Sequence, residues 1–281
     1  MTDTNALVPV ESVDQLAARI ANGASVAVAP DYSGCAMEVV RTLMRRGAEN
    51  LHLIGVPQVG FQGDMLIGAG CVATLETAAL TLGEYGRAPR FTAAVREGTI
   101  ALQDATCPVI HAGLQAAEKG IPFMPLRGIL GSDLVRHRSD WRVIENPFAP
   151  ANQQDPILLV PAIQPDVALF HAPLADRYGN VWIGVRRELM LMAHAARTTL
   201  VTVEAFSDEN LLSDNRVAAG TIPALYISAL AHATNGAWPI GLFGRYPPDQ
   251  AHLQRYVEMA ATASGFEQYL RECVNKQRVS A

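Results

Sequence analysis

The sequence lacks the cysteine and histidine patterns that mark disulfide-rich and metal-binding proteins. Only four of its 281 residues are cysteine, namely Cys35, Cys71, Cys107 and Cys273, and no two of them form a CxxC pair. Wide spacing of this kind predicts reduced thiols in a cytosolic protein. The seven histidines are equally dispersed, so we expect no metal site.

Clustered charge and long apolar runs are also missing. The net charge is −5 and the lysines and arginines are scattered, whereas a nucleic-acid binder needs a basic stripe. The amino-terminal residues lack the charged and apolar regions of a signal peptide. No apolar run approaches the ~18 residues of a membrane span. We therefore expect a cytoplasmic protein that binds neither nucleic acid nor membrane.

What the sequence does contain is a regular alternation of two kinds of segment. Short, apolar, β-branched runs alternate with longer runs rich in Ala, Leu, Arg and Glu, which is typical of βαβ units. With 49% hydrophobic residues, a core is easily buried. The prediction is an α/β fold with an open, mostly parallel sheet and flanking helices. We expect a single domain over 1–281 with a C-terminal helical extension.

The expected elements follow from periodicity and from turn residues. The expected strands are Ser25–Ala29, Leu51–Val56, Val72–Leu75, Thr99–Gln103, Ile157–Val160, Val167–His171, Val181–Gly184 and Thr199–Glu204. The expected helices are Val13–Asn22, Cys35–Arg46, Ala88–Glu97, Pro108–Lys119, Glu188–Arg197 and Leu253–Cys273. Between Gly131 and Asp155 the chain is polar and rich in Pro and Asn. A loop of that length is usually functional or part of an interface.

Several common motifs are absent. Ala29–Gly34 occupies the place of a GxGxxG turn, and the sequence has no GxxxxGK[ST], HExxH or GxSxG motif, which argues against hydride transfer and P-loop chemistry. Loops at strand ends remain, where open α/β sheets bind ligands. In Pro30–Gly34, backbone N–H groups and Ser33 are suited to hold a phosphate or a carboxylate. The same residues also suit a helix cap and turn, and the sequence leaves both interpretations open.

Five further side chains lie at or near predicted strand ends or helices. Asp104 is a candidate general base or a helix cap, and its sequence context favours the cap. Glu76 and Glu84 flank an apolar stretch, where a buried carboxylate would have a raised pKa, although two exposed acids on a loop are the simpler interpretation. His171 ends a strand and is a better catalytic candidate than a helical histidine such as His111.

A set of motifs then resembles one family. They occur in one order between Ser25 and Glu204: Asp64-Met65-Leu66-Ile67-Gly68, Gly120-Ile121-Pro122-Phe123-Met124-Pro125, Gly131-Ser132, Glu145-Asn146-Pro147-Phe148 and Pro165-Asp166-Val167-Ala168-Leu169-Phe170-His171-Ala172. Together they resemble the alpha subunit of family I CoA-transferases, most closely the glutaconate CoA-transferase type. The resemblance to the alpha subunit of two-subunit steroid ring-opening CoA-ester hydrolases is slightly weaker.

This resemblance implies a NagB/RpiA/CoA-transferase-like fold and a beta subunit of similar size, in an αβ or α2β2 assembly. In such transferases the beta subunit supplies a glutamate that attacks the acyl-CoA thioester. An anhydride and then a glutamyl-CoA thioester form, and the acceptor carboxylate resolves the latter. This chain would shape the acyl pocket and part of the CoA site. Coenzyme A would be a cosubstrate, with no permanently bound cofactor.

The resemblance also suggests site residues. The expected substrate and CoA contacts are Asp31, Tyr32, Ser33, Gly34, Gln58, Glu76, Arg127, Gly131 and Ser132. The hydrolase relatives use an acid of their alpha chain, for which Asp104 is the nearest match. Relatives carry a glycine-rich turn where this chain has Ala29-Pro30-Asp31-Tyr32. The loop Glu76–Gly86 offers two acids and no serine, which argues against a dicarboxylate substrate. Three hypotheses for this chain remain. It is the alpha subunit of a CoA-transferase, a subunit of a CoA-ester hydrolase, or a non-catalytic ligand-binding protein of the same fold.

Overall fold

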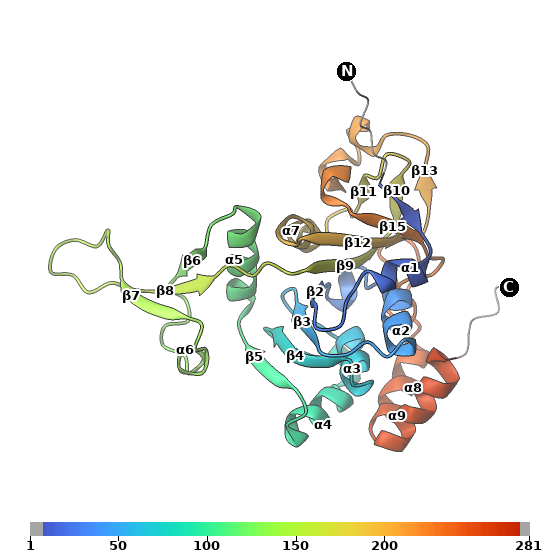
Figure 1. The fold of residues 1–281 in the computed structure, drawn as a ribbon, viewed down its shortest axis with the longest axis horizontal. Helices are drawn as coiled ribbons and strands as arrows, with labels where there is room; N and C mark the ends of the chain where they lie inside the picture. Colours follow the sequence, from blue (N-terminus) through green and yellow to red (C-terminus); the bar gives the residue numbers. More distant parts are fainter. Residues whose placement is uncertain (1–7, 276–281) are drawn as a thin grey trace.

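The structure, a computed structural model, describes residues 8–275 and is built around one fully parallel sheet. Its strands run in the order β1-β15-β12-β9-β2-β3-β4-β5 (Figure 1). They are β1 (Val10–Glu11), β2 (Ser25–Val28), β3 (Leu51–Gly55), β4 (Val72–Thr77), β5 (Ala101–Asp104), β9 (Val167–Ala172), β12 (Thr198–Val203) and β15 (Ala229–His232). The predicted open, parallel α/β architecture is confirmed.

Helices cover both faces of this sheet, which is why its central strands are apolar along their whole length. In β2, Val26 and Val28 pack into one hydrophobic core and Ala27 into the other, because neighbouring side chains point to opposite faces. The first core is closed by α1 (Val13–Ala18), α2 (Met37–Arg45), α3 (Phe61–Gly68), α4 (Pro89–Glu97), α8 (Gln250–Ala260) and α9 (Ala263–Tyr269). The second is closed by α5 (Cys107–Glu118) and α7 (Arg187–Ala195).

The strand order reverses between β2 and β9. From β2 the chain adds β3, β4 and β5 on one side, and from β9 it adds β12 and β15 on the other, where the amino-terminal strand β1 pairs with β15 as the edge. At such a switch point the loops leaving two adjacent strands diverge, so a crevice opens beyond the carboxyl ends of the strands. The loop after β2 is the segment Pro30–Gly34 that the sequence singled out. Gly34 has φ 94°, and an added Cβ there would lie 2.1 Å from the carbonyl oxygen of His171.

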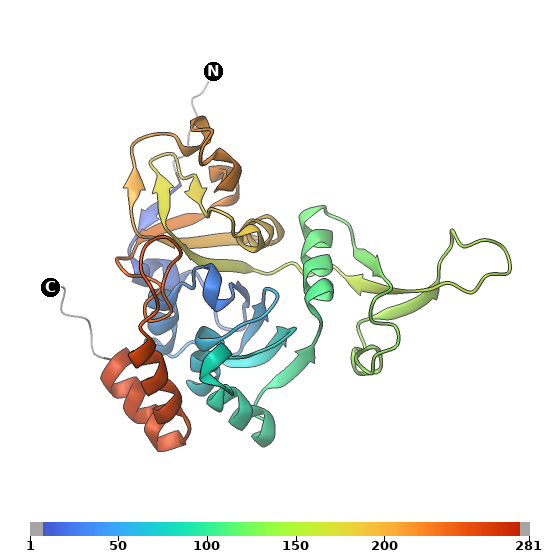
Figure 2. The ribbon, with the colours of Figure 1, turned by 180° about the vertical axis from the view of Figure 1, so that it is seen from behind.

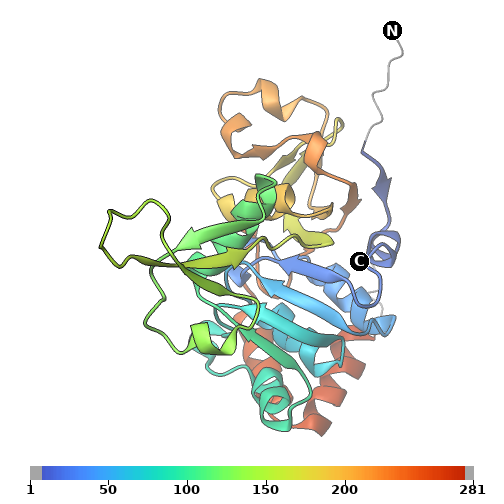
Figure 3. The ribbon, with the colours of Figure 1, turned by 60° about the vertical axis from the view of Figure 1, so that its left-hand side comes forward.

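An arm projects from the body between α5 and β9 (Figures 1 and 2). It consists of a three-stranded antiparallel sheet in the order β6-β8-β7 and one short helix. The elements are β6 (Phe123–Leu126), α6 (Leu134–His137), β7 (Arg142–Glu145) and β8 (Pro156–Pro161). The interpretation of 131–155 as one long loop is therefore wrong, because α6 and β7 lie within it. Figure 3 shows the arm in front of the main sheet.

A second small sheet, in the order β13-β10-β11-β14, extends the other end of the molecule. Its strands are β10 (Leu174–Asp176), β11 (Val181–Trp182), β13 (Phe206–Ser207) and β14 (Thr221–Ile222). The buried Asp176 carboxylate accepts hydrogen bonds from the backbone N–H groups of Tyr178, Asn180 and Leu211. It thereby fixes the turn between β10 and β11.

Most expected elements are present with ends shifted by a few residues, but two helices differ more. The expected helix Val13–Asn22 ends at Ala18. The expected helix Leu253–Cys273 is two helices, because Thr262 ends the first and caps the second by accepting from the Gly265 N–H. A π-helical turn, Leu270–Val274, follows α9. Within residues 8–275, no helix is both long and apolar enough to cross a membrane.

Candidate functional site

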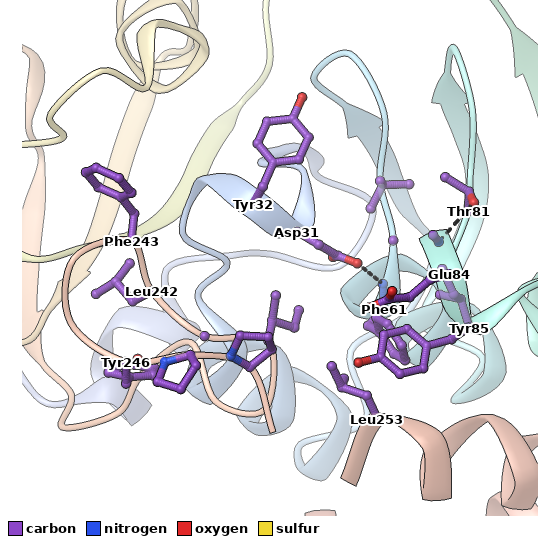
Figure 4. Close-up of a pocket in the computed structure, with 18 of the residues that line it drawn as sticks. Asp31, Tyr32, Phe61, Thr81, Glu84, Tyr85, Leu242, Phe243, Tyr246 and Leu253 are labelled. Carbon is purple, nitrogen blue, oxygen red and sulfur yellow. Dashed lines mark hydrogen bonds between the residues drawn. The ribbon is translucent and has the colours of Figure 1, made fainter. Parts of the chain in front are cut away.

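A cavity of about 900 Å³ opens at the switch point (Figure 4). Its floor is made by the loops that leave β2, β3 and β4, and its roof by the segment between β15 and α8. The lining residues are Asp31, Tyr32, Gln58, Val59, Gly60, Phe61, Thr81, Leu82, Gly83, Glu84, Tyr85, Arg186, Ile240, Gly241, Leu242, Phe243, Gly244, Arg245, Tyr246, Pro247, Pro248 and Leu253. This volume suits a small-molecule ligand. Of the sequence-predicted contacts, Asp31, Tyr32 and Gln58 line it.

Asp31 lies at the centre of the cavity floor. Its Oδ2 accepts a hydrogen bond of 3.2 Å from the backbone N–H of Phe61, and the Cys35 thiol lies 3.8 Å from Oδ1. Gly60 makes this position accessible, since a Cβ there would lie 2.0 Å from Oδ2. Burial raises the pKa of Asp31 to about 7, against the lowering effect of the Phe61 hydrogen bond. Asp31 is therefore able to exchange a proton near neutral pH.

One end of the cavity is apolar. The rings of Phe61 and Tyr85 pack edge to face with centroids 5.5 Å apart, and Leu82 and Leu253 are almost completely buried beside them. The phenol of Tyr85 and the side chain of Leu253 lie together at this end in Figure 4. Such a surface favours the apolar part of a ligand.

The other end combines one cation with two aromatic rings. The guanidinium carbon of Arg186 lies 5.2 Å from the ring centroid of Tyr32 and 5.5 Å from that of Phe243. Both rings are about half exposed, at 51% and 52%. Arg186 directly precedes α7, which places it over the switch point although it lies far from Tyr32 in sequence.

The roof of the cavity is braced by a partly buried acid, Glu204. One carboxylate oxygen accepts from the His171 ring at 2.7 Å, from the Tyr246 hydroxyl at 2.7 Å and from the Gly236 N–H at 3.0 Å. The other accepts from the Asn235 N–H at 2.9 Å. Burial alone would raise the pKa of Glu204, but these hydrogen bonds lower it to about 2. His171 is completely buried, so it supports the roof and does not reach the cavity surface.

Two predicted contacts in the first loop point away from the cavity. Ser33 is buried and its hydroxyl donates a hydrogen bond to Glu188. Gly34 packs against the backbone of His171. The alternative interpretation expected these residues to form a turn and to cap the next helix. Residues 31–33 do form one 3₁₀ turn. Neither Asp31 nor Ser33 caps α2, because Asp31 accepts from the Phe61 N–H and Ser33 donates to Glu188.

The sequence suggested that Glu76 is an exposed acid on a loop, but it is not. It is 4% exposed and lies in β4, in a second cavity of about 200 Å³. Its carboxylate pairs with Arg138 at 2.8 Å, and His52 Nε2 lies 3.3 Å away. Arg138 also stacks on Trp141, with its guanidinium carbon 4.6 Å from the ring centroid. Glu84, in contrast, is exposed at the rim of the large cavity.

Asp104 ends β5, as predicted, but it does not cap α5. Thr106 is the residue before the helix, and the Asp104 carboxylate instead accepts from the adjacent Ala105 N–H at 3.1 Å. Asp104 is exposed and is not among the residues that line the large cavity. His111 lies half-buried on α5, where burial lowers its pKa.

The remaining predicted contacts belong to the arm. Arg127 pairs with Asp155, Gly131 is exposed, and the Ser132 hydroxyl donates to the carbonyl of Ile129 at 2.9 Å. The structure does not bring them together with Asp31. Sequence reasoning missed Arg186 and the roof segment around Phe243 and Tyr246. The Gly- and Pro-rich stretch 239–248 was the available signal for a loop between strand and helix.

An all-parallel sheet with a cavity at its switch point is typical of α/β proteins that bind small molecules there. Residues 10–232 match the coenzyme A transferase family. The chain belongs to this family.

Two relatives and one solved structure are similar to this chain over most of its length. The chain is 31% identical to the A subunit of glutaconate CoA-transferase from Acidaminococcus fermentans, over 83% of this chain and 76% of that protein. It is 30% identical to the A subunit of 3-oxoadipate CoA-transferase from Pseudomonas knackmussii, over 83% and 81%. The crystal structure of the Acidaminococcus glutaconate CoA-transferase superposes with a TM-score of 0.86 at 26% identity, covering 96% of this chain and 89% of that one. A further relative, from Archaeoglobus fulgidus, is 28% identical over 85% of this chain but only 52% of that protein, so this chain spans about half the length of that relative.

Proposed function

We propose that this chain is the alpha subunit of a heteromeric acyl-CoA:carboxylate CoA-transferase. The observation that carries the proposal is the large cavity at the switch point of a chain in the coenzyme A transferase family. Open α/β proteins bind their ligands there, and two relatives are named as the A subunits of CoA-transferases. Coenzyme A is then a cosubstrate and no cofactor is bound permanently.

In this proposal the chain shapes the acyl site and a beta subunit supplies the nucleophilic glutamate. Asp31, Tyr32 and Gln58 are the expected contacts of this chain with substrate. The glutamate attacks the thioester carbonyl and expels the CoA thiolate. The thiolate then attacks the glutamyl carbonyl of the resulting anhydride, which releases the first carboxylate and leaves a glutamyl-CoA thioester. A carboxyl such as Asp31, with a pKa of about 7, is suited to hold a proton near the departing thiolate.

The arm is the surface that we assign to the beta subunit in an αβ or α2β2 assembly. Phe148, in the loop between β7 and β8 at the tip of the arm, is 91% exposed, and Phe123 and Ile144, which line one cavity with it, are each more than 40% exposed. A cluster of exposed apolar side chains on a thin sheet is typical of an interface. We also infer a cytoplasmic location, because all four cysteines are unpaired.

The direct test is borohydride trapping of the glutamyl-CoA thioester in the complex of the two subunits. Incubation with acyl-CoA is expected to label the partner beta chain, to leave this chain unlabelled and to inactivate CoA exchange. An active complex that turns over acyl-CoA and yet yields no trapped thioester would refute the transferase mechanism.

Asp31 favours a second candidate, a CoA-ester hydrolase on the same scaffold. A carboxyl with a raised pKa in an apolar cavity can act as general base toward water. Hydrolysis predicts release of free CoA without any acceptor carboxylate, and loss of that release in Asp31→Asn. The matched variant Asp104→Asn separates this hypothesis from the one in which Asp104 is the base, since only one of the two changes is expected to abolish turnover.

A further inference from the structure

Arg186 differs from the other arginine of the large cavity, because its guanidinium donates no hydrogen bond to any acceptor among the described residues 8–275. Its Nε is buried and has no hydrogen-bond partner in that part of the chain, and no ion pair with an acid is found for it there. Arg245, the other arginine, donates to the carbonyl of Pro173 at 3.1 Å. A guanidinium whose donors lack protein acceptors is suited to receive them from a ligand.

None of the nearby acids forms an ion pair with Arg186 within residues 8–275. Asp31 accepts from the Phe61 N–H, Glu188 accepts from the Ser33 hydroxyl, and Glu84 lies on the loop after β4, at the rim beside Tyr85. The positive charge of Arg186 is thus directed at the cavity. The approach of an anion there replaces no existing ion pair, so it carries no cost of breaking one.

The two aromatic rings fix how Arg186 presents its donors. Tyr32 and Phe243 lie 5.2 and 5.5 Å from the guanidinium carbon. Stacking of this kind limits the rotamers of a long side chain and leaves the planar edge of the guanidinium free for a bidentate partner. A planar carboxylate matches that edge with two parallel hydrogen bonds.

The opposite end of the cavity fixes the rest of the ligand. Phe61, Leu82, Tyr85 and Leu253 form an apolar wall, where a second charged group would lose its hydration without a partner. A ligand that occupies both ends therefore has one anionic head and an apolar body.

We propose that Arg186, held between Tyr32 and Phe243, binds the carboxylate of an aliphatic or aromatic monocarboxylic acid whose apolar body lies against Phe61 and Tyr85. This proposal deepens the proposed function, and rests on it only in taking the cavity as the site of the carboxylate substrate. It assigns a binding residue in the second half of the chain and a substrate class.

The test compares two adjacent arginines in the complex of both subunits. Arg186→Gln removes the charge in the cavity, and Arg187→Gln removes one from an exposed neighbour that is not in the cavity lining. Calorimetric titration uses butanoate, hexanoate, phenylacetate, hexanamide and inorganic phosphate. Hexanoate is expected to bind about tenfold more weakly to Arg186→Gln and within about twofold of wild type to Arg187→Gln. Hexanoate should also bind more tightly than butanoate, by about fourfold for each added methylene.

Arg186→Lys keeps the positive charge but lacks the forked guanidinium. Its affinity for hexanoate is expected to lie between those of wild type and Arg186→Gln. This intermediate affinity, together with an unchanged melting temperature, would show that the loss in Arg186→Gln is not a folding defect. Equal hexanoate affinity in the two glutamine variants would overturn the proposal. So would equal affinity for hexanoate and hexanamide, or a dependence on Arg186 confined to phosphate, which would assign the residue to CoA. Failure of the proposed function would give a different result from failure of this proposal. In that case carboxylates would still bind through Arg186, but the complex would show no CoA exchange.

Discussion

The Glu204→Gln substitution tests whether the roof of the cavity depends on one partly buried carboxylate. Glu204 is 11% exposed and accepts four hydrogen bonds, from two side chains and two backbone N–H groups. Its pKa falls from an ordinary value of 4.5 to about 2. At about 1.4 kcal/mol for each pH unit, this difference corresponds to roughly 3 kcal/mol of stability. In the variant, the amide NH₂ faces at least one of these donors, so we expect a loss of about 2–3 kcal/mol at pH 7.

The contribution of Glu204 to the free energy of unfolding should depend on pH in a definite direction. Since the folded-state pKa of Glu204 is below the unfolded value, its contribution is complete above pH 4.5 and is lost as the pH falls toward 2. Urea unfolding between about pH 7 and about pH 2.5 should therefore show the two proteins converging as the pH falls. Glu209→Gln, an exposed acid on the same segment, serves as control and should change stability by less than about 0.5 kcal/mol. A Glu204→Gln protein that stays within about 1 kcal/mol of wild type at neutral pH would refute the reasoning.

Three other substitutions probe separate contacts. Gly60→Ala places a Cβ against the Asp31 carboxylate and should cost about 1–3 kcal/mol by chemical denaturation; in an Asp31→Ala background most of that cost should disappear, and a cost unchanged there would contradict the clash. Glu76→Gln leaves buried Arg138 with only the half-exposed Asp140 as its ionic partner and should cost about 2 kcal/mol in the same assay, whereas an unchanged unfolding midpoint would contradict it. Phe148→Asp should leave the melting temperature of the isolated chain unchanged but weaken association with the beta subunit in analytical ultracentrifugation; undiminished association would exclude the arm tip from the interface.

Much of the fold was predictable because its signals are local. The run Val167–His171 is apolar at nearly every position, which is typical of a strand covered on both faces, and it forms the central strand β9. The Pro- and Asn-rich stretch 131–155 was wrongly predicted to be a loop. Its elements α6 and β7 lie on a projecting arm, where few contacts with the core impose a periodic pattern of apolar residues. The break in the last helix depends on one capping hydroxyl, that of Thr262, amid residues that mostly favour helix.

The candidate site was predictable only where it follows the strands. Asp31, Tyr32 and Gln58 come shortly after β2 and β3, so the general rule for parallel sheets finds them. Glu76 has the same kind of position, yet it faces Arg138, because the direction of a strand residue depends on register that the sequence does not reveal. Arg186 precedes a helix in a different part of the chain, and only the tertiary fold brings it to Tyr32.

The roof explains why the second half of the chain matters to a site whose floor lies in the first half. The floor loops emerge from β2, β3 and β4, while the roof is fixed from below by His171 on β9 and Glu204 just after β12. Because β9 pairs with β2 across the switch point, the strand that carries His171 also abuts the Asp31 loop at Gly34. Floor and roof therefore share one rigid support, and a change in either strand is expected to alter the width of the cavity rather than its position.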